Sequence, residues 1–279
     1  MSKLSENFYT LRDKNDSLLV IGYDPKNENE SAKCVELSKT KEGIIGGKPN
    51  SKFYQTSYGR KDLKTISTNI GPELIRTVDC KSADGADSNF AEIKDFSKEY
   101  EYVTIAPHSS DIEDTIEYAK TVNVETISMG VMSFPGILRK LHDGGYKVML
   151  KEVERAVMAG TAGIVMGATG YVPQSGIEKT LEEYRKKNSG AIRSLTDAEL
   201  ISAIYLRNNL FKSIIELTQN TDIIYLVPGF GRQGGNIEYF LESGIKLNRC
   251  MINAGSDILK AEKPLYAINE MNQKFRPYW

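Results

Sequence analysis

The stretch Leu74-Ile-Arg-Thr-Val-Asp-Cys-Lys-Ser-Ala-Asp84 places two carboxylates around one lysine at the end of an apolar run. If this run is a strand, its side chains alternate between two faces, so Asp79 and Lys81 point the same way while Asp84 lies in the following loop. An ammonium between carboxylates stays protonated and could deliver a proton where negative charge develops. The alternative is a solvated charge cluster, with Asp84, Asp87 or Ser88 as the cap of a helix that begins near Asn89.

The composition favours a globular protein that acts on a small molecule. The 279 residues include 36 Lys and Arg and 37 Asp and Glu, so the formal net charge of −1 indicates no nucleic-acid partner. The three cysteines are widely spaced and fit neither a disulfide framework nor a zinc motif. The chain lacks an apolar signal segment and any apolar stretch of membrane-spanning length. We therefore expect a soluble, cytoplasmic protein with no membrane partner.

Short apolar runs alternate with amphipathic helical patterns along the chain. This alternation predicts a parallel sheet with helices outside it, and eight such units predict a closed (β/α)8 TIM barrel that forms one domain over residues 1–279. Strands are expected over 18–23, 43–47, 74–81, 102–106, 125–131, 162–168, 223–227 and 249–253. Helices are expected over 88–100, 111–121, 151–159, 175–187 and 236–243, among others.

The segment 188–220 lies outside this alternation of strands and helices. It carries a strong helical pattern over 197–217, between the sixth helix and the seventh strand. We interpret it as an added helical lid or interface piece.

Polar residues gather where the expected strands end, which is where a barrel of this kind places its chemistry. Any one of them could reflect turn geometry alone, because Gly, Pro, Asp and Ser are common at turns. Their joint placement at successive strand ends indicates a site. The residues are Asp24, Lys48, Asp79, Lys81, His108, Ser133, Thr169 and Gln233.

The loop Pro228-Gly-Phe-Gly-Arg-Gln-Gly-Gly235 predicts a phosphate cradle after the seventh strand. Its glycines would let backbone amides approach an anion, and a helix that opens near Asn236 would aim its positive end at that anion. The loop also reads G-x-G-x-x-G, but it comes too late in the chain for a dinucleotide-binding unit and lacks the acidic residue that should follow. A glycine-rich turn with no ligand remains the alternative.

Six motifs, in this order, make the chain resemble the orotidine 5′-phosphate decarboxylase family. The Asp-x-Lys-x-x-Asp element alone is shared with related sugar-phosphate lyases, whereas Lys-Pro-Asn-Ser, Ser-x-Pro-Gly and Gln-Gly-Gly are more specific. The resemblance runs from about the first strand to the eighth. The motifs are Gly22-Tyr-Asp24, Lys48-Pro-Asn-Ser-Lys-Phe-Tyr54, Asp79-x-Lys81-x-x-Asp84, Ser133-Phe-Pro-Gly136, Val165-Met-Gly-Ala-Thr169 and Val227-Pro-Gly-x-Gly-x-Gln-Gly-Gly235.

The resemblance implies decarboxylation of orotidine 5′-monophosphate to uridine 5′-monophosphate in pyrimidine biosynthesis, without a metal or organic cofactor. Lys81 would protonate the pyrimidine carbon as carbon dioxide leaves, Asp79 would press against the substrate carboxylate, and Lys48 would complete the charge network. Asp84 would reach into the neighbouring subunit's site, which implies a homodimer with shared sites. The implied substrate-binding residues are Asp24 for the ribose, Ser133 for the pyrimidine edge, Gln233, Gly234 and Gly235 for the phosphate, and Ser88 and Pro228.

The chain departs from the family pattern at two places. After Asp84 the family commonly has Ile-Gly-Asn-Thr, whereas this chain reads Gly-Ala-Asp-Ser88. The usual phosphate-binding arginine aligns with Ser256. Arg232 could substitute for it, and the next candidates are Arg249 or a residue of the inserted segment. Two alternatives stay open: a metal-dependent sugar-phosphate lyase or aldolase, and a nucleotide-binding relative with weakened catalysis.

Overall fold

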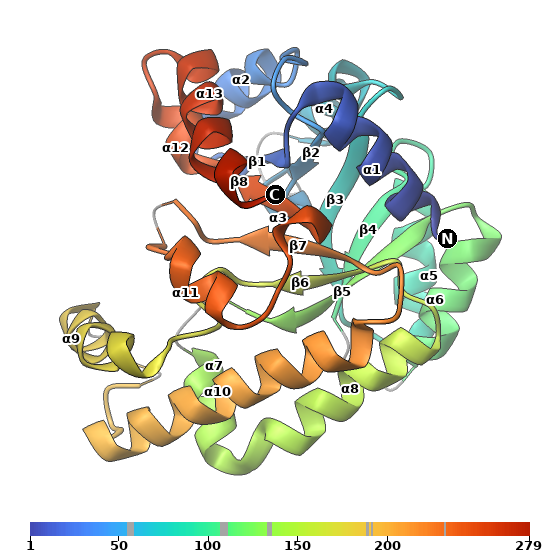
Figure 1. The fold of residues 1–279 in the computed structure, drawn as a ribbon. Helices are drawn as coiled ribbons and strands as arrows, with labels where there is room; N and C mark the ends of the chain where they lie inside the picture. Colours follow the sequence, from blue (N-terminus) through green and yellow to red (C-terminus); the bar gives the residue numbers. More distant parts are fainter. Residues whose placement is uncertain (55–58, 107–110, 133–135, 188–189, 191, 232) are drawn as a thin grey trace.

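Eight parallel strands form a closed barrel in the computed structural model, which confirms the predicted (β/α)8 fold (Figure 1). The strands pair in chain order, and β8 closes the barrel by pairing with β1. The structure describes residues 1–54, 59–106, 111–132, 136–187, 190, 192–231 and 233–279. The strands are β1 Leu19–Tyr23, β2 Gly46–Pro49, β3 Ile75–Ser82, β4 Tyr102–Ile105, β5 Glu125–Val131, β6 Gly163–Met166, β7 Ile224–Pro228 and β8 Cys250–Ala254.

Helices cover the outer face of the barrel and the strands' own side chains fill its interior, so the strands are mostly apolar and buried. Within the described ranges, no helix has both the length and the hydropathy to cross a lipid bilayer. The helices are α1 Lys3–Asn15, α2 Glu28–Leu37, α3 Ser51–Tyr54, α4 Gly59–Ile70, α5 Ala86–Phe96, α6 Ile112–Thr121, α7 Gly136–Lys140, α8 Tyr146–Met158, α9 Ile177–Lys187, α10 Asp197–Thr218, α11 Ile237–Glu242, α12 Ser256–Lys260 and α13 Pro264–Phe275.

Helix α1 lies at the amino ends of the strands. The backbone N–H of Leu4 donates a hydrogen bond to Glu125 Oε2 at the start of β5, over 2.7 Å. Gly163, the first residue of β6, lies directly against the Leu4 side chain. The carboxyl ends of the strands, on the opposite side, are therefore left for the site.

Strand β2 begins three residues later than the sequence predicts. Gly43 has φ of +68°, a left-handed conformation that does not continue a strand. The strand instead extends beyond Gly47 and includes Lys48, which pairs in register with Gly22 of β1. Lys48 is thus held by a strand and not by the following loop.

Helix α5 begins at Ala86, earlier than the expected start near Asn89. Its N-cap residue is Gly85, and no side chain makes a capping hydrogen bond there. The capping role considered for Asp84, Asp87 or Ser88 is therefore wrong.

The helix predicted over 197–217 is confirmed as α10, which ends one residue later. Thr196 and Glu199 form a capping box at its start. The helix runs along α8 and also contacts β5, while α9 stands farther from the barrel (Figure 1). The inserted helix is thus part of the layer that surrounds the barrel, not a detached lid.

Candidate active site

A network of three charged side chains lies at the carboxyl ends of β2 and β3. Lys48 Nζ lies 2.5 Å from Asp79 Oδ2, and Lys81 Nζ contacts the other carboxylate oxygen, Oδ1. The side chains of Lys48 and Asp79 are only 5% and 10% exposed, while that of Lys81 is 35% exposed. The predicted common face of Asp79 and Lys81 is confirmed, and closure of the barrel adds Lys48 to it.

The backbone of Lys81 is held in a conformation that residues other than glycine seldom adopt. Its φ is +53°, and the pairing between β3 and β4 shifts register around it. Thr104 of β4 supports this bend, because its hydroxyl accepts a hydrogen bond from the Lys81 N–H and donates one to Asp79 Oδ1, each over 3.0 Å. One hydroxyl therefore positions both the lysine and the carboxylate.

The charged side chains of the network keep one another ionised. Burial alone would raise the pKa of Asp79, but Lys48 and Lys81 outweigh it and hold that pKa well below its ordinary value of 3.8. Burial likewise opposes the charge on Lys48, yet the pKa of Lys48 is raised because Asp79 and Asp24 lie beside it. Asp79 is therefore an anion and Lys48 a cation at neutral pH.

Asp24 is a partly buried carboxyl group next to the network. Burial raises its pKa, an effect that Lys48 only partly offsets and that Asp79 increases. Its Oδ1 atom has no hydrogen-bond partner among the described residues, and the same holds for Oδ1 of Asn253 on β8. Two buried acceptors thus lack donors, which a bound molecule with hydroxyl groups could supply.

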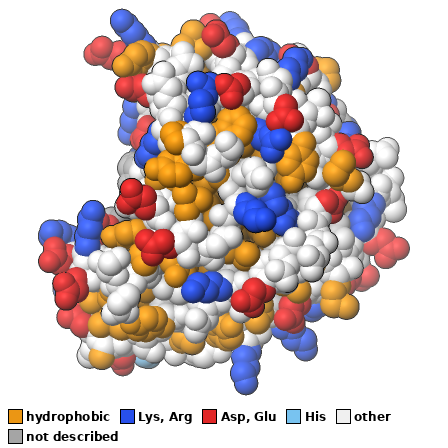
Figure 2. All heavy atoms as spheres, in the orientation of Figure 1, with side chains coloured by type: hydrophobic (Ala, Val, Ile, Leu, Met, Phe, Trp, Pro, Cys, Tyr) orange, Lys and Arg blue, Asp and Glu red, His pale blue; other side chains and the backbone are white. Residues whose placement is uncertain are grey.

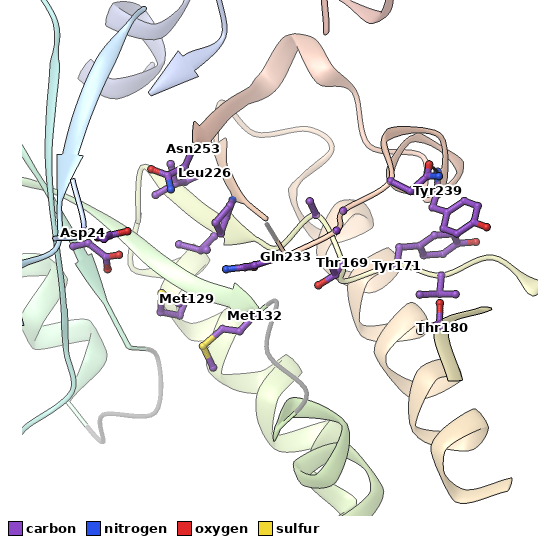
Figure 3. A pocket seen from close by; sticks show the side chains of 18 of the residues that line it. Asp24, Met129, Met132, Thr169, Tyr171, Thr180, Leu226, Gln233, Tyr239 and Asn253 are labelled. Atoms are coloured by element: carbon purple, nitrogen blue, oxygen red, sulfur yellow. Dashed lines mark hydrogen bonds between the residues drawn. The ribbon is translucent and has the colours of Figure 1, made fainter. Parts of the chain in front are cut away.

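A cavity of about 630 Å³ opens over these residues (Figure 3). Asp24 lies at one end of it, and Tyr171, Thr180 and Tyr239 lie together at the other, with Gln233 between (Figure 3). Figure 2 shows the molecule hollowed on this side, with charged and apolar side chains around the hollow. The volume is that of a site for a small organic molecule.

The structure brings nine of the predicted site residues to the walls of this cavity: Asp24, Lys48, Asp79, Lys81, Thr169, Pro228, Gln233, Gly234 and Gly235. Asp84 and Ser88 are described but do not line it; both are exposed on the segment after β3. Asp84 accepts a hydrogen bond from the Gly85 N–H over 2.8 Å. Ser133, Arg232 and His108 lie outside the described residues.

The glycine-rich loop after β7 uses the two amides expected to cradle phosphate within itself. The N–H of Gly234 donates to Gly231 O and that of Gly235 to Gly229 O, each over 2.8 Å. Gly229 and Gly234 have φ of +112° and +79°, and a Cβ at Gly235 would lie 2.7 Å from Gly229 O. The loop's own geometry thus explains these glycines, and an anion would bind the amides only after they exchange partners.

The structure also places Ser256 and Arg249, the two residues that the sequence analysis discusses with the phosphate-binding arginine. Ser256 begins α12 directly after β8. The Arg249 guanidinium donates to the carbonyls of Thr218 and Ile223 at the opposite, amino end of β7. Arg249 is therefore occupied in structural contacts away from the cavity.

Sequence reasoning missed several residues of the cavity. Thr104 and Asn253 are polar residues near the ends of otherwise apolar strands, a signal that was present in the sequence but is common in any protein. Asn50, Tyr184 and Tyr239 come from loops and helices, so only the folded chain shows that they face the site. Among the described residues, no three His, Cys, Asp or Glu side chains are grouped so that they could hold a metal ion.

Comparison with known proteins identifies the fold. No protein-family model matches the chain, and no curated protein sequence matches it. The fold is similar to that of Leishmania donovani OMP decarboxylase, with a TM-score of 0.68 and 19% identity over 98% of both chains. It is similar to Leishmania donovani UMP synthase, with a TM-score of 0.67 and 17% identity, where 97% of this chain spans only 55% of the other.

A third solved structure is orotidine 5′-monophosphate decarboxylase from Methanocaldococcus jannaschii in complex with the inhibitor BMP. The match has a TM-score of 0.61 and 17% identity, over 91% of this chain and 96% of that one. Sequence identities this low establish a shared architecture. The chain therefore has the (β/α)8 barrel fold of the solved orotidine 5′-monophosphate decarboxylases.

Proposed function

We propose that this protein decarboxylates orotidine 5′-monophosphate to uridine 5′-monophosphate. The observation that carries the proposal is the buried Lys48–Asp79–Lys81 network at the wall of a ligand-sized cavity, on a barrel with the fold of enzymes that catalyse this reaction. A fold alone does not define an activity, so the argument rests on what these side chains can do.

Asp79 and Lys81 supply the two halves of a decarboxylation. The Asp79 anion, fixed by Lys48 and Thr104, opposes a substrate carboxylate bound beside it and so favours release of that group. The bond between the pyrimidine carbon and the carboxylate breaks, carbon dioxide leaves, and the electron pair stays on the ring carbon. The Lys81 ammonium gives a proton to that carbon, which forms the new C–H bond and leaves a neutral amine.

The two buried acceptors without donors support the placement of the ribose. Asp24 Oδ1 and Asn253 Oδ1 can each accept a hydrogen bond from a sugar hydroxyl. This contact would replace the water that Asp24 loses on burial. Ser133 would bind the pyrimidine edge, and Pro228 would contact the same nucleotide.

The phosphate would lie at the loop after β7, against Gln233, Gly234 and Gly235, with the two glycine amides turning from their carbonyl partners in the loop to the phosphate. Arg232 would supply the cation that Ser256 cannot. If so, Arg232→Ala raises the Michaelis constant by a factor that corresponds to about 2–5 kcal/mol, and Ser256→Arg partly restores it. Unchanged kinetics and unchanged uridylate affinity in Arg232→Ala would rule this role out.

We also propose a cytoplasmic homodimer in which Asp84 and Ser88 act in the partner's site. Both side chains are exposed and neither lines the cavity of its own chain, which is consistent with that role. Inactive Lys81→Ala and Asp84→Ala proteins, mixed and allowed to exchange subunits, should then regain activity through one intact site. No recovery after demonstrated exchange would place Asp84 outside the partner's site.

A spectrophotometric assay with orotidylate, with and without a chelator, tests the function. Turnover that the chelator does not affect supports the proposal. Chelator-sensitive cleavage of a sugar phosphate with no orotidylate turnover would favour a metal-dependent lyase or aldolase. Uridylate binding without turnover of orotidylate would instead indicate a nucleotide-binding relative.

A further inference from the structure

Helix α10 holds the outer wall of the cavity through two neighbouring side chains. The amide of Asn208 accepts from the Val172 N–H over 3.0 Å and donates to the Val172 carbonyl over 2.6 Å. Arg207 Nη1 donates to the hydroxyl of Tyr184 on α9 over 2.8 Å. Val172 and Tyr184 both line the cavity, so the inserted helix supports the site from behind.

Arg207 is an unusual residue in this position. It is fully buried, yet its Nε and Nη2 atoms have no hydrogen-bond partner among the described residues. A buried guanidinium is costly unless its charge is used. Among the described residues its guanidinium donates one hydrogen bond, to the Tyr184 hydroxyl, which connects this charge to the cavity wall.

The direction of this hydrogen bond determines what Tyr184 offers to a ligand. The Tyr184 oxygen accepts from Arg207, so the hydroxyl hydrogen must point elsewhere. No acceptor for that hydrogen is found in the part of the chain that the structure describes, and the side chain faces the cavity. A hydroxyl polarised by a cation is a strengthened donor, and its best partner is an anionic oxygen.

We propose that Tyr184, positioned by Arg207, donates a hydrogen bond to the phosphate of the nucleotide ligand. The inference rests on the proposed function for the identity of that ligand. Tyr184 follows Thr180 by one helical turn, so both face the same way, and Thr180 lies at the end of the cavity beyond Gln233 (Figure 3). Lys179 on the same wall is exposed, whereas Arg207 is fully buried behind Tyr184.

The test compares uridine 5′-monophosphate with uridine by titration calorimetry. Tyr184→Phe should weaken binding of the nucleotide about tenfold and leave that of the nucleoside within about twofold, since only the nucleotide carries the phosphate. Arg207→Met should shift the same ratio in the same direction. The double variant should be no weaker than Tyr184→Phe, because Arg207 acts through the tyrosine.

Tyr225→Phe is the matched control. Tyr225 is also buried and bonded to α10, through Thr218, but it does not line the cavity, so its nucleotide-to-nucleoside ratio should stay unchanged. An unchanged ratio in folded Tyr184→Phe would overturn the inference, as would equal losses for both ligands. If Arg207→Met does not fold, Tyr184→Phe alone still decides. Orotidylate turnover by the unaltered protein is measured separately, so failure of the function and failure of this contact are distinguishable.

Discussion

Replacing Asp79 by asparagine should destabilise the protein strongly, because it removes the anion between two ammonium groups. Lys48 is the main cause: its side chain is 5% exposed, and Asp79 is the carboxylate it contacts, at 2.5 Å. Removing one partner of such a buried pair costs about 3–5 kcal/mol, because the other charge stays buried without compensation. Lys81 adds less, since its more exposed ammonium can turn toward water.

The free energy of unfolding, measured by urea denaturation with circular dichroism, checks this value. Lys48→Met/Asp79→Asn, which removes both buried charges, should recover most of the loss. Glu36→Gln is the control. Glu36 pairs with Lys39 on the surface, where the two side chains are 74% and 59% exposed, so this substitution should change the free energy of unfolding by less than about 1 kcal/mol.

The effect should also depend on pH in one direction. The pKa of Asp79 in the folded protein lies below its ordinary value of 3.8, so its contribution is complete above that value and is lost as the pH falls toward the folded pKa. The difference between the original protein and Asp79→Asn should therefore shrink in strong acid. A loss under about 1 kcal/mol at pH 7, or a double variant no more stable than Asp79→Asn, would refute the reasoning.

Three further substitutions test single features of the site. Lys81→Ala should abolish decarboxylation yet bind uridylate with nearly unchanged affinity, and substantial turnover by the folded variant would contradict its role as proton donor. Asp24→Asn should raise the melting temperature at pH 7 while weakening nucleotide binding. Burial raises the pKa of Asp24, so the ionised carboxylate destabilises the folded protein above that pKa. The increase in melting temperature should therefore vanish below pH 3.8. Thr104→Val removes the hydroxyl shared by Lys81 and Asp79 and should lower the free energy of unfolding in urea by about 1–3 kcal/mol. It should also lower kcat by more than it changes uridylate affinity. Equal effects on kcat and on uridylate affinity would mean that Thr104 only fills space.

The barrel and the centre of its site could be predicted from the sequence because both depend on local order. Apolar runs that alternate with amphipathic helices already specify parallel strands with helical crossovers. Asp79 and Lys81 lie two residues apart on a strand, so strand geometry predicts their common face, although it does not predict the left-handed backbone at Lys81. The ends of elements are harder to predict. The sequence predicts Gly43 as the start of a strand, but its backbone is left-handed, and β2 covers Gly46–Pro49 and so includes Lys48.

Only the tertiary structure decided which distant side chains complete the site. Lys48 is 31 residues from Asp79 and Thr104 is 25 residues from it, and closure of the barrel brings all three together. Arg207 and Tyr184 meet only because α10 packs beneath the cavity wall. The glycine loop shows the same limit, since its composition predicts amides that can approach an anion but not that two of them donate within the loop. Hydrogen bonds and ion pairs between elements depend on packing of the whole chain, and a local pattern carries no information about that packing.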